Sequence, residues 1–286
     1  MDGFVAVLGA TGRQGGAVAR HLLADGRRVR ALTRDPSSGK ARMLAQAGAE
    51  VMRADMSDVA TLRPAFAGAQ GVFSVQNPMI CGLDEEVVQG RNVGDAAADA
   101  GVRHVVYGSA GVDRAGTGVG SWESKMVIKA HLLRLGLPLT VLRPTALMEL
   151  MTDKDFYPPV SMWHLMPKLI GADRPLLWLC SDDFGAVAAR AFAEPDRFAG
   201  VDLALVSDVV SIDGCRELYR EAFGHAPRRF PMPVRLFERF AGDDLVRMWR
   251  WLRENQVEAD PAATRAIVPG ARSVREWLVS RARQAS

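Results

Sequence analysis

Three glycines spaced three apart, Gly9, Gly12 and Gly15, are the residues of this sequence with the clearest chemical use. They follow the apolar run 4–8 and open a helix-like stretch over residues 16–24. Glycine lets the backbone turn sharply and approach a phosphate, and the free N–H groups at a helix start attract negative charge. The spacing therefore predicts a loop that holds the pyrophosphate of a dinucleotide. The same loop contains Thr11, Arg13 and Gln14.

The residue after the second expected strand, 28–33, distinguishes the two nicotinamide dinucleotides. An acidic residue there binds the adenosine ribose hydroxyls of NAD, whereas an arginine pairs with the 2′-phosphate of NADP. This chain has Arg34 at that point, and Arg13 offers a second guanidinium. Asp35 comes next, but Pro36 restricts how the segment turns. We therefore expect NADP(H) as the cofactor; the alternative is that Arg34 is a solvated residue at a strand end.

Two further strand ends supply candidate cofactor contacts. Asp55 and Met56 lie at the end of the third expected strand, where adenine packs in such folds. Asp55 has an alternative interpretation as a cap for the helix start at 57–60. Gln76 and Asn77 end the fourth expected strand and would lie under the nicotinamide ribose.

Hydride transfer to a carbonyl needs a proton donor, and the usual donor is missing from this sequence. Short-chain dehydrogenases supply a Tyr-x-x-x-Lys pair on one helix face and a Ser or Thr after the fifth strand. Here Ser109 and Lys125 are present, but the residue four before Lys125 is Ser121. Tyr107 lies inside the fifth expected strand. Lys125 is predicted to hold the nicotinamide ribose, to act itself as the acid–base group, or to be a surface lysine.

Strands and helices alternate along the first half of the chain, and this alternation must position those residues. The expected strands are 4–8, 28–33, 51–55, 71–76, 103–108 and 139–143. The expected helices are 16–24, 38–48, 58–67, 84–100 and 123–135. This order predicts an α/β fold with a doubly wound parallel sheet, the Rossmann architecture, whose ligands bind beyond the carboxyl ends of the strands.

The second half of the chain is less regular and predicts a smaller, mostly helical C-terminal lobe. We expect a dinucleotide-binding domain over residues 1–150, to whose sheet residues 176–206 return, and a substrate or partner lobe over 151–286. Strand patterns occur at 176–179 and 201–205, a helix at 184–192, and prolines interrupt the helices beyond 213.

Composition limits the classes of protein that this chain can belong to. It has 286 residues, 48% of them hydrophobic, and a net charge of +3, which argues against direct binding of nucleic acid or membranes. Its three cysteines, Cys81, Cys180 and Cys215, show no metal-like spacing and suit a reducing, cytoplasmic compartment. No apolar run is long enough to span a bilayer, and we expect no signal peptide.

Several of these segments together resemble the NmrA-like family of atypical short-chain dehydrogenase/reductase proteins. The segments that carry the resemblance are Gly9–Arg20, Leu32–Pro36, Gln89–Val93 and His104–Ser109. The family includes regulators that sense NADPH and neighbours reductases of quinones and triphenylmethanes. The resemblance implies NADP contacts from the 9–14 loop, Arg34, Gln76, Asn77 and Lys125, and places the segment from Thr145 to Met148 beside the nicotinamide. The chain departs from the pattern at Val88, where a lysine is often found, and at 147–149, which replace an aromatic-Glu-Asn element.

Two functions follow as expectations. The first is an NADP(H)-binding redox sensor or regulator that lacks the catalytic tyrosine and acts on a protein partner. The second is an NADPH-dependent oxidoreductase that reduces a quinone or another small electrophile, because such acceptors can take their proton from water. Apolar residues between 148 and 163 would suit a flat apolar substrate or form the core of the smaller lobe.

Overall fold

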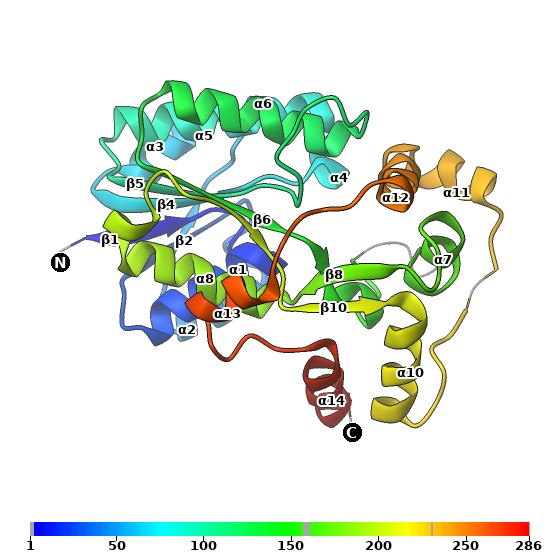
Figure 1. Ribbon diagram of the computed structural model, residues 1–286. Helices are drawn as coiled ribbons and strands as arrows, with labels where there is room; N and C mark the ends of the chain where they lie inside the picture. Colours follow the sequence, from blue (N-terminus) through cyan, green and yellow to red (C-terminus); the bar gives the residue numbers. More distant parts are fainter. Residues whose placement is uncertain (1–2, 157–160, 230, 286) are drawn as a thin grey trace. The chain divides into compact units, whose positions relative to one another are not determined.

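The computed structural model describes residues 3–156, 161–229 and 231–285 of the chain (Figure 1). The described residues form two compact units. The first comprises residues 1–115, 121–143 and 184–203, and the second comprises 116–120, 144–183 and 204–286.

The first unit is built on a seven-stranded sheet. In chain order its strands are β1 (Phe4–Val7), β2 (Val29–Thr33), β3 (Glu50–Arg53), β4 (Ala69–Val75), β5 (His104–Gly108), β6 (Leu139–Pro144) and β9 (Asp202–Leu205). Their order across the sheet is β3-β2-β1-β4-β5-β6-β9, and the pairs from β3 to β6 are parallel. The chain therefore reverses its winding direction between β1 and β4, which confirms the predicted doubly wound sheet.

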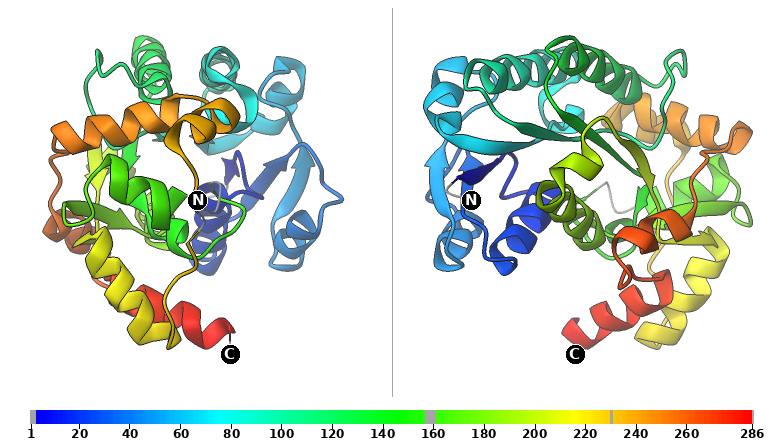
Figure 2. Two further views of the ribbon diagram at one scale, coloured as in Figure 1. Left: turned by 90° about the vertical axis from the view of Figure 1, so that its right-hand side faces the viewer. Right: turned by 60° about the vertical axis from the view of Figure 1, so that its left-hand side comes forward.

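Helices cover both faces of this sheet (Figures 1 and 2). On one face lie α3 (Val59–Phe66), α5 (Leu83–Asp99) and α6 (Gly120–Arg134), and on the other lie α1 (Arg13–Ala24), α2 (Gly39–Gln46) and α8 (Ser181–Ala193). Two short helices, α4 (Pro78–Cys81) and α9 (Pro195–Phe198), follow β4 and α8. Because both faces are covered, every residue of β1 and β5 is buried, as expected for a parallel sheet.

Side chains at the helix starts fix where several of these helices begin. Ser38 accepts the Ala41 N–H at the start of α2, and Asp58 accepts the Ala60 N–H at the start of α3. Asn77 does the same for the Met79 N–H at the start of α4. The cap at Asp58 agrees with the helix predicted from residue 58, whereas the sequence analysis did not anticipate α4.

The second unit contains a three-stranded sheet in the order β10-β8-β7 and a largely helical remainder, which confirms the predicted helical character of the C-terminal lobe. The strands are β7 (Ala146–Leu147), β8 (Pro175–Leu179) and β10 (Asp208–Ser211). The helical segments are η1 (Met148–Met151), η2 (Ser161–Leu165), α7 (Met166–Leu169), α10 (Ile212–Phe223), α11 (Val234–Ala241), α12 (Asp244–Glu254), α13 (Pro261–Ile267) and α14 (Val274–Ala285).

The segment 176–206 divides between the two sheets. We expected all of it to return to the main sheet, but only β9 lies there. β8 instead pairs antiparallel with β10 and parallel with β7, because the residues after β9 turn back and present β10 to it.

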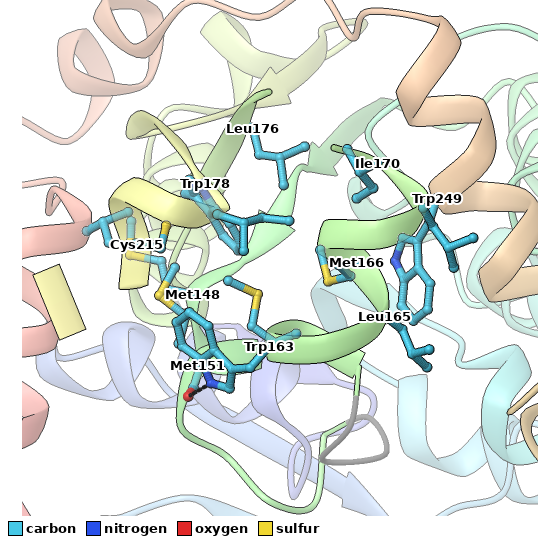
Figure 3. Close-up of a cluster of buried hydrophobic side chains, with 14 of the residues drawn as sticks. Met148, Met151, Trp163, Leu165, Met166, Ile170, Leu176, Trp178, Cys215 and Trp249 are labelled. Carbon is cyan, nitrogen blue, oxygen red and sulfur yellow. Dashed lines mark hydrogen bonds between the residues drawn. The ribbon is translucent and has the colours of Figure 1, made fainter. Parts of the chain in front are cut away.

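The core of the second unit is rich in sulfur and indole groups (Figure 3). Met148, Met151, Met162 and Met166 are all nearly or fully buried in it. The indole N–H of Trp163 donates to the Met151 carbonyl at 3.2 Å, so the polar atom of that side chain is satisfied within an apolar cluster. Four of the apolar residues of the 148–163 region, Met148, Met151, Met162 and Trp163, are thus core residues of this unit.

Among the residues that the structure describes, no helix combines the length and apolarity needed to cross a bilayer.

Candidate functional site

The glycine loop connects the end of β1 to the start of α1. Gly9 has a φ of +60°, and its carbonyl accepts the Gly12 N–H at 2.8 Å, which closes a tight turn. A Cβ on Gly15 would lie 2.4 Å from the Gly9 oxygen, so no other residue fits there without moving the backbone. Thr11 and Arg13 are half-buried, and Arg13 is the first residue of α1. The loop therefore places Gly12, an exposed residue without a side chain, at the N-terminus of a helix.

Gln14, in the first turn of α1, points toward the end of β5. A Cβ on Gly108 would lie 3.0 Å from its Oε1, and that oxygen is buried without a hydrogen-bond partner among the described residues. The same holds for Oε1 of Gln76. Buried polar atoms normally have partners, so these two oxygens, one after β4 and one facing the end of β5, indicate a site for a polar ligand.

In the described part of the chain, the end of β2 offers an unpaired cation, Arg34, beside a carboxylate, Asp35, of which one oxygen is hydrogen-bonded. Arg34 is exposed, and among the described residues nothing pairs with its guanidinium. The Asp35 carboxylate accepts from the Ser37 hydroxyl at 2.6 Å and from the Ser37 N–H at 2.9 Å. These bonds lower the pKa of Asp35. The carboxylate is thus held within its own turn, while the arginine is open to solvent.

Asp55 and Met56 follow β3 in a polar turn. The Asp55 carboxylate accepts the Ser57 N–H at 3.0 Å, but the residue that caps α3 is Asp58, so the alternative interpretation of Asp55 as that helix cap is wrong. The Met56 sulfur lies 3.5 Å from Nε2 of Gln76. The structure therefore brings Met56 and Gln76 together, although 20 positions separate them in the chain.

Gln76 and Asn77 directly follow β4 and lie in different environments. Gln76 is buried and donates through Nε2 to the Ser74 hydroxyl at 2.9 Å. Asn77 is exposed, and its side-chain oxygen is already used by the cap of α4. The side-chain amide nitrogen of Asn77 thus stays available to a ligand, whereas its oxygen does not.

Lys125 lies in the second turn of α6, because that helix begins at Gly120 rather than at the expected residue 123. Its ammonium is 2.7 Å from Oε1 of Glu86 and donates to the carbonyl of Gln76 at 3.2 Å. Lys125 is therefore not a surface lysine: its side chain is 12% exposed, and it joins α5, α6 and the end of β4.

Ser109 is buried directly after β5, and its N–H donates to the Leu142 carbonyl at 2.8 Å. Tyr107, two residues earlier on the same face of the strand, is fully buried. Burial, reinforced by the charge of Glu86, raises the pKa of the Tyr107 phenol well above its ordinary value. Tyr107 is packed in the core, as expected.

Thr145 belongs to the second unit, where it follows β6. Both its N–H and its hydroxyl donate to the carbonyl of Leu205, at 3.2 and 3.0 Å. Its hydroxyl proton is thus engaged within the unit.

Glu86 is the residue of this region that the sequence analysis missed. It lies in the first turn of α5 with Asp84 and Glu85, and three acidic residues at a helix start are typical of a solvated turn that interacts with the helix dipole. The side chain of Glu86 is nevertheless fully buried. Within the described part of the chain, no group of three or more His, Cys, Asp or Glu side chains could hold a metal ion.

Comparison with known proteins identifies relatives of the whole chain. The sequence model of the NmrA-like family matches residues 1–278. The NmrA-like family domain-containing oxidoreductase malD of Malbranchea aurantiaca is 31% identical over 254 residues, which cover 78% of this chain and 74% of malD.

Solved structures share the fold at lower identity. NmrA, described as a negative transcriptional regulator, in complex with NADP is 22% identical with a TM-score of 0.78 and covers 98% of this chain and 95% of its own. NmrA has also been solved with NAD. The triphenylmethane reductase of Citrobacter sp., complexed with NADP(H), is 20% identical with a TM-score of 0.79, over 98% of this chain and 99% of the reductase.

Proposed function

This chain belongs to the NmrA-like family, and from that premise we propose that it binds a nicotinamide dinucleotide, NADP(H) in preference to NAD(H). The observation that carries the proposal is the glycine loop, because its packing excludes any side chain at Gly15 and leaves backbone at the start of α1 for a pyrophosphate. The unpartnered oxygens of Gln14 and Gln76 support the same conclusion, because a polar ligand would satisfy them.

The preference for NADP(H) rests on the end of β2. Both hydrogen bonds that Ser37 donates to the Asp35 carboxylate go to Oδ1, so they orient this carboxylate toward its own turn. Arg34 beside it is exposed and unpaired in the described structure, which suits a phosphate dianion. Arg13 would contribute a second cation from the loop. NmrA has been solved with NADP and with NAD, so the preference proposed for this chain is argued from its own residues at the end of β2.

The remaining contacts follow the strand ends. Asp55 and Met56 would lie at the adenine end, and Gln76, Asn77 and Lys125 at the nicotinamide ribose. Ser109 and Thr145 would lie nearer the reacting ring. In this proposal residues 1–150 hold the cofactor and residues 151–286 bind a substrate or a protein partner.

We propose that the protein acts as an NADP(H)-binding sensor or regulator. The chemistry that such a cofactor supplies when bound is hydride transfer. No tyrosine stands four residues before Lys125, where Ser121 is found; Tyr107 is fully buried in β5, and Tyr219 belongs to α10. Tyr157 lies outside the described residues. Lys125 contacts Glu86 and the carbonyl of Gln76, which suits a role in binding the nicotinamide ribose.

A reductase of a quinone or another small electrophile is the second candidate. The observation that favours it is the oxidoreductase name of malD, which aligns over most of this chain. Such an acceptor can be protonated by water after hydride arrives, so the missing tyrosine does not exclude it.

One set of measurements tests both candidates. Calorimetric titration with NADPH and NADH measures the cofactor preference, and equal affinities would contradict it. Absorbance of the reduced cofactor, followed with a panel of quinones and aldehydes, measures turnover. Turnover that disappears in Gly12→Val and Lys125→Ala supports the reductase, whereas tight binding without turnover and a cofactor-dependent change in proteolysis support the sensor.

A further inference from the structure

The buried carboxylate of Glu86 has two partners, one for each oxygen. Oε1 lies 2.7 Å from the Lys125 ammonium, and Oε2 accepts a hydrogen bond from the Ser124 hydroxyl. The side chain of Glu86 is 0% exposed. Burying a carboxylate is costly unless it is paired and hydrogen-bonded, so this arrangement requires both partners to be held in place.

The helices that carry these residues pack at a fixed register. On α5, Glu86, Gly90 and Gly94 are spaced four apart and share one face. A Cβ on Gly90 would lie 2.5 Å from Ile128, and one on Gly94 would lie 2.7 Å from Leu132. Ser124, Ile128 and Leu132 of α6 have the same spacing, and each of the three pairs is 38 positions apart. The two glycines thus let α5 approach α6 closely where Glu86 meets its partners.

The position of the Lys125 ammonium follows from this packing. An ammonium has three donors, and in the described structure those of Lys125 have two partners, Glu86 and the carbonyl of Gln76. One donor is left for a ligand. Since Gln76 directly follows β4 at the carboxyl edge of the sheet, the free donor belongs to the region where a doubly wound fold binds its ligand.

We propose that Glu86 is a positioning residue for the cofactor site. Its carboxylate anchors the Lys125 ammonium against the carbonyl of Gln76, so that the remaining N–H donor meets the nicotinamide ribose hydroxyls without first having to be ordered. This inference rests on the proposed binding of NADP(H). Glu86 itself touches no part of the cofactor and acts through Lys125.

The test compares two ligands that share one end. NADPH reaches the nicotinamide ribose pocket, whereas adenosine 2′,5′-bisphosphate has only the adenosine and 2′-phosphate end. We expect Glu86→Gln to weaken NADPH binding about tenfold, the effect of losing one well-placed charge-assisted hydrogen bond. Affinity for the bisphosphate should be unchanged. The matched control is Asp84→Asn, which removes the same charge from an exposed position two residues away and should bind both ligands like the wild type.

A double-mutant cycle separates positioning from a general structural effect. If Glu86 acts through Lys125, the Glu86→Gln/Lys125→Met double variant should bind NADPH no more weakly than Lys125→Met alone. The proposal would be overturned if the losses of NADPH affinity in the two single variants added up in the double variant. It would also be overturned if Glu86→Gln weakened the binding of NADPH and of the bisphosphate equally. If Glu86→Gln does not fold, Ser124→Ala provides the same comparison with the charge pair intact, and it should weaken NADPH binding about threefold while leaving the bisphosphate unaffected.

The outcomes distinguish this inference from the function on which it rests. A wild-type protein that binds neither ligand refutes the proposed function. A wild-type protein that binds both, together with a Glu86→Gln variant of equal NADPH affinity, refutes only the role of Glu86.

Discussion

Gly90 of α5 lies against Ile128 of α6, and a single Cβ added to Gly90 would come within 2.5 Å of the Ile128 side chain. A backbone contact of this kind holds the two helices at one distance, because neither partner can be enlarged without moving a helix. The ion pair between Glu86 and Lys125 lies one turn away along the same contact.

Replacing Gly90 should therefore destabilise the first unit. We expect Gly90→Ala to lower the free energy of unfolding by about 1–3 kcal/mol, the usual cost of overpacking a core, measured by chemical denaturation. Gly39→Ala is the control, since Gly39 begins α2 at the surface and its added Cβ would meet only the end of Arg42 at 4.0 Å. That variant should be as stable as the wild type or slightly more so. Equal effects of the two substitutions would mean that the α5–α6 contact is not tight.

The glycine loop can be tested in the same way. A Cβ on Gly15 would lie 2.4 Å from the carbonyl oxygen of Gly9 and 2.5 Å from that of Leu8, so Gly15→Ala must displace the loop. We expect NADPH affinity to fall at least about tenfold, because the backbone N–H groups would no longer converge on the pyrophosphate. Calorimetry gives the affinity, and circular dichroism checks that the variant is folded. A folded variant with wild-type affinity would rule out the loop as the pyrophosphate site.

Arg34 should decide between the two dinucleotides. We expect Arg34→Ala to weaken NADPH binding about tenfold to a hundredfold, the range for a lost charge-assisted contact, and to leave NADH binding unchanged. The exposed Arg63 on α3 supplies a control of equal charge, Arg63→Ala, that should alter neither affinity. If Arg34→Ala weakened NADH binding as much as NADPH binding, the guanidinium would not be the group that binds the 2′-phosphate.

His104 should make the first unit sensitive to mild acid. Burial lowers the pKa of His104 from its ordinary value of 6.5 to about 4, and its Nε2 lies 2.8 Å from the Thr140 hydroxyl. The unfolded chain therefore binds more protons than the folded one between pH 6.5 and about 4. The contribution of neutral His104 to the free energy of unfolding is fully present above pH 6.5. It is lost as the pH falls toward 4, by at most about 3 kcal/mol.

Denaturation curves at several pH values would measure this contribution. His104→Gln should be less sensitive to pH than the wild type across that interval, and a variant of the exposed His225, His225→Gln, should follow the wild type. A wild type and a His104→Gln variant with parallel pH profiles would show that His104 does not cause the acid sensitivity.

The main sheet was predictable because its signals are local. A buried strand, a glycine loop and a helix follow one another within residues 4–24, and each pattern is complete within a few residues. The Asp58 cap and the glycine after α5, Gly101 with a φ of +64°, are equally local. The doubly wound parallel sheet then followed from the alternation of strands and helices.

The features that sequence did not predict depend on distant partners. β8 is apolar enough for either sheet, and its partners β10 and β7 have only four and two residues, too few for a periodic pattern. α4 is a single turn whose Asn77-Pro78 start is also typical of a loop. Glu86 differs from Glu85 only in what it meets across 39 positions of sequence, namely the ammonium of Lys125.

The buried methionines of the second unit can report how often its core opens to solvent. Met148, Met151, Met162 and Met166 are shielded from solvent, whereas Met43 and Met79 of the first unit are 68% and 45% exposed. An oxidant such as peroxide converts exposed methionines to sulfoxides directly, but it reaches shielded ones only when the surrounding structure opens. The oxidation rates of the buried and the exposed methionines can be measured residue by residue by mass spectrometry. The difference between the two rates would therefore measure how often the core of the second unit opens.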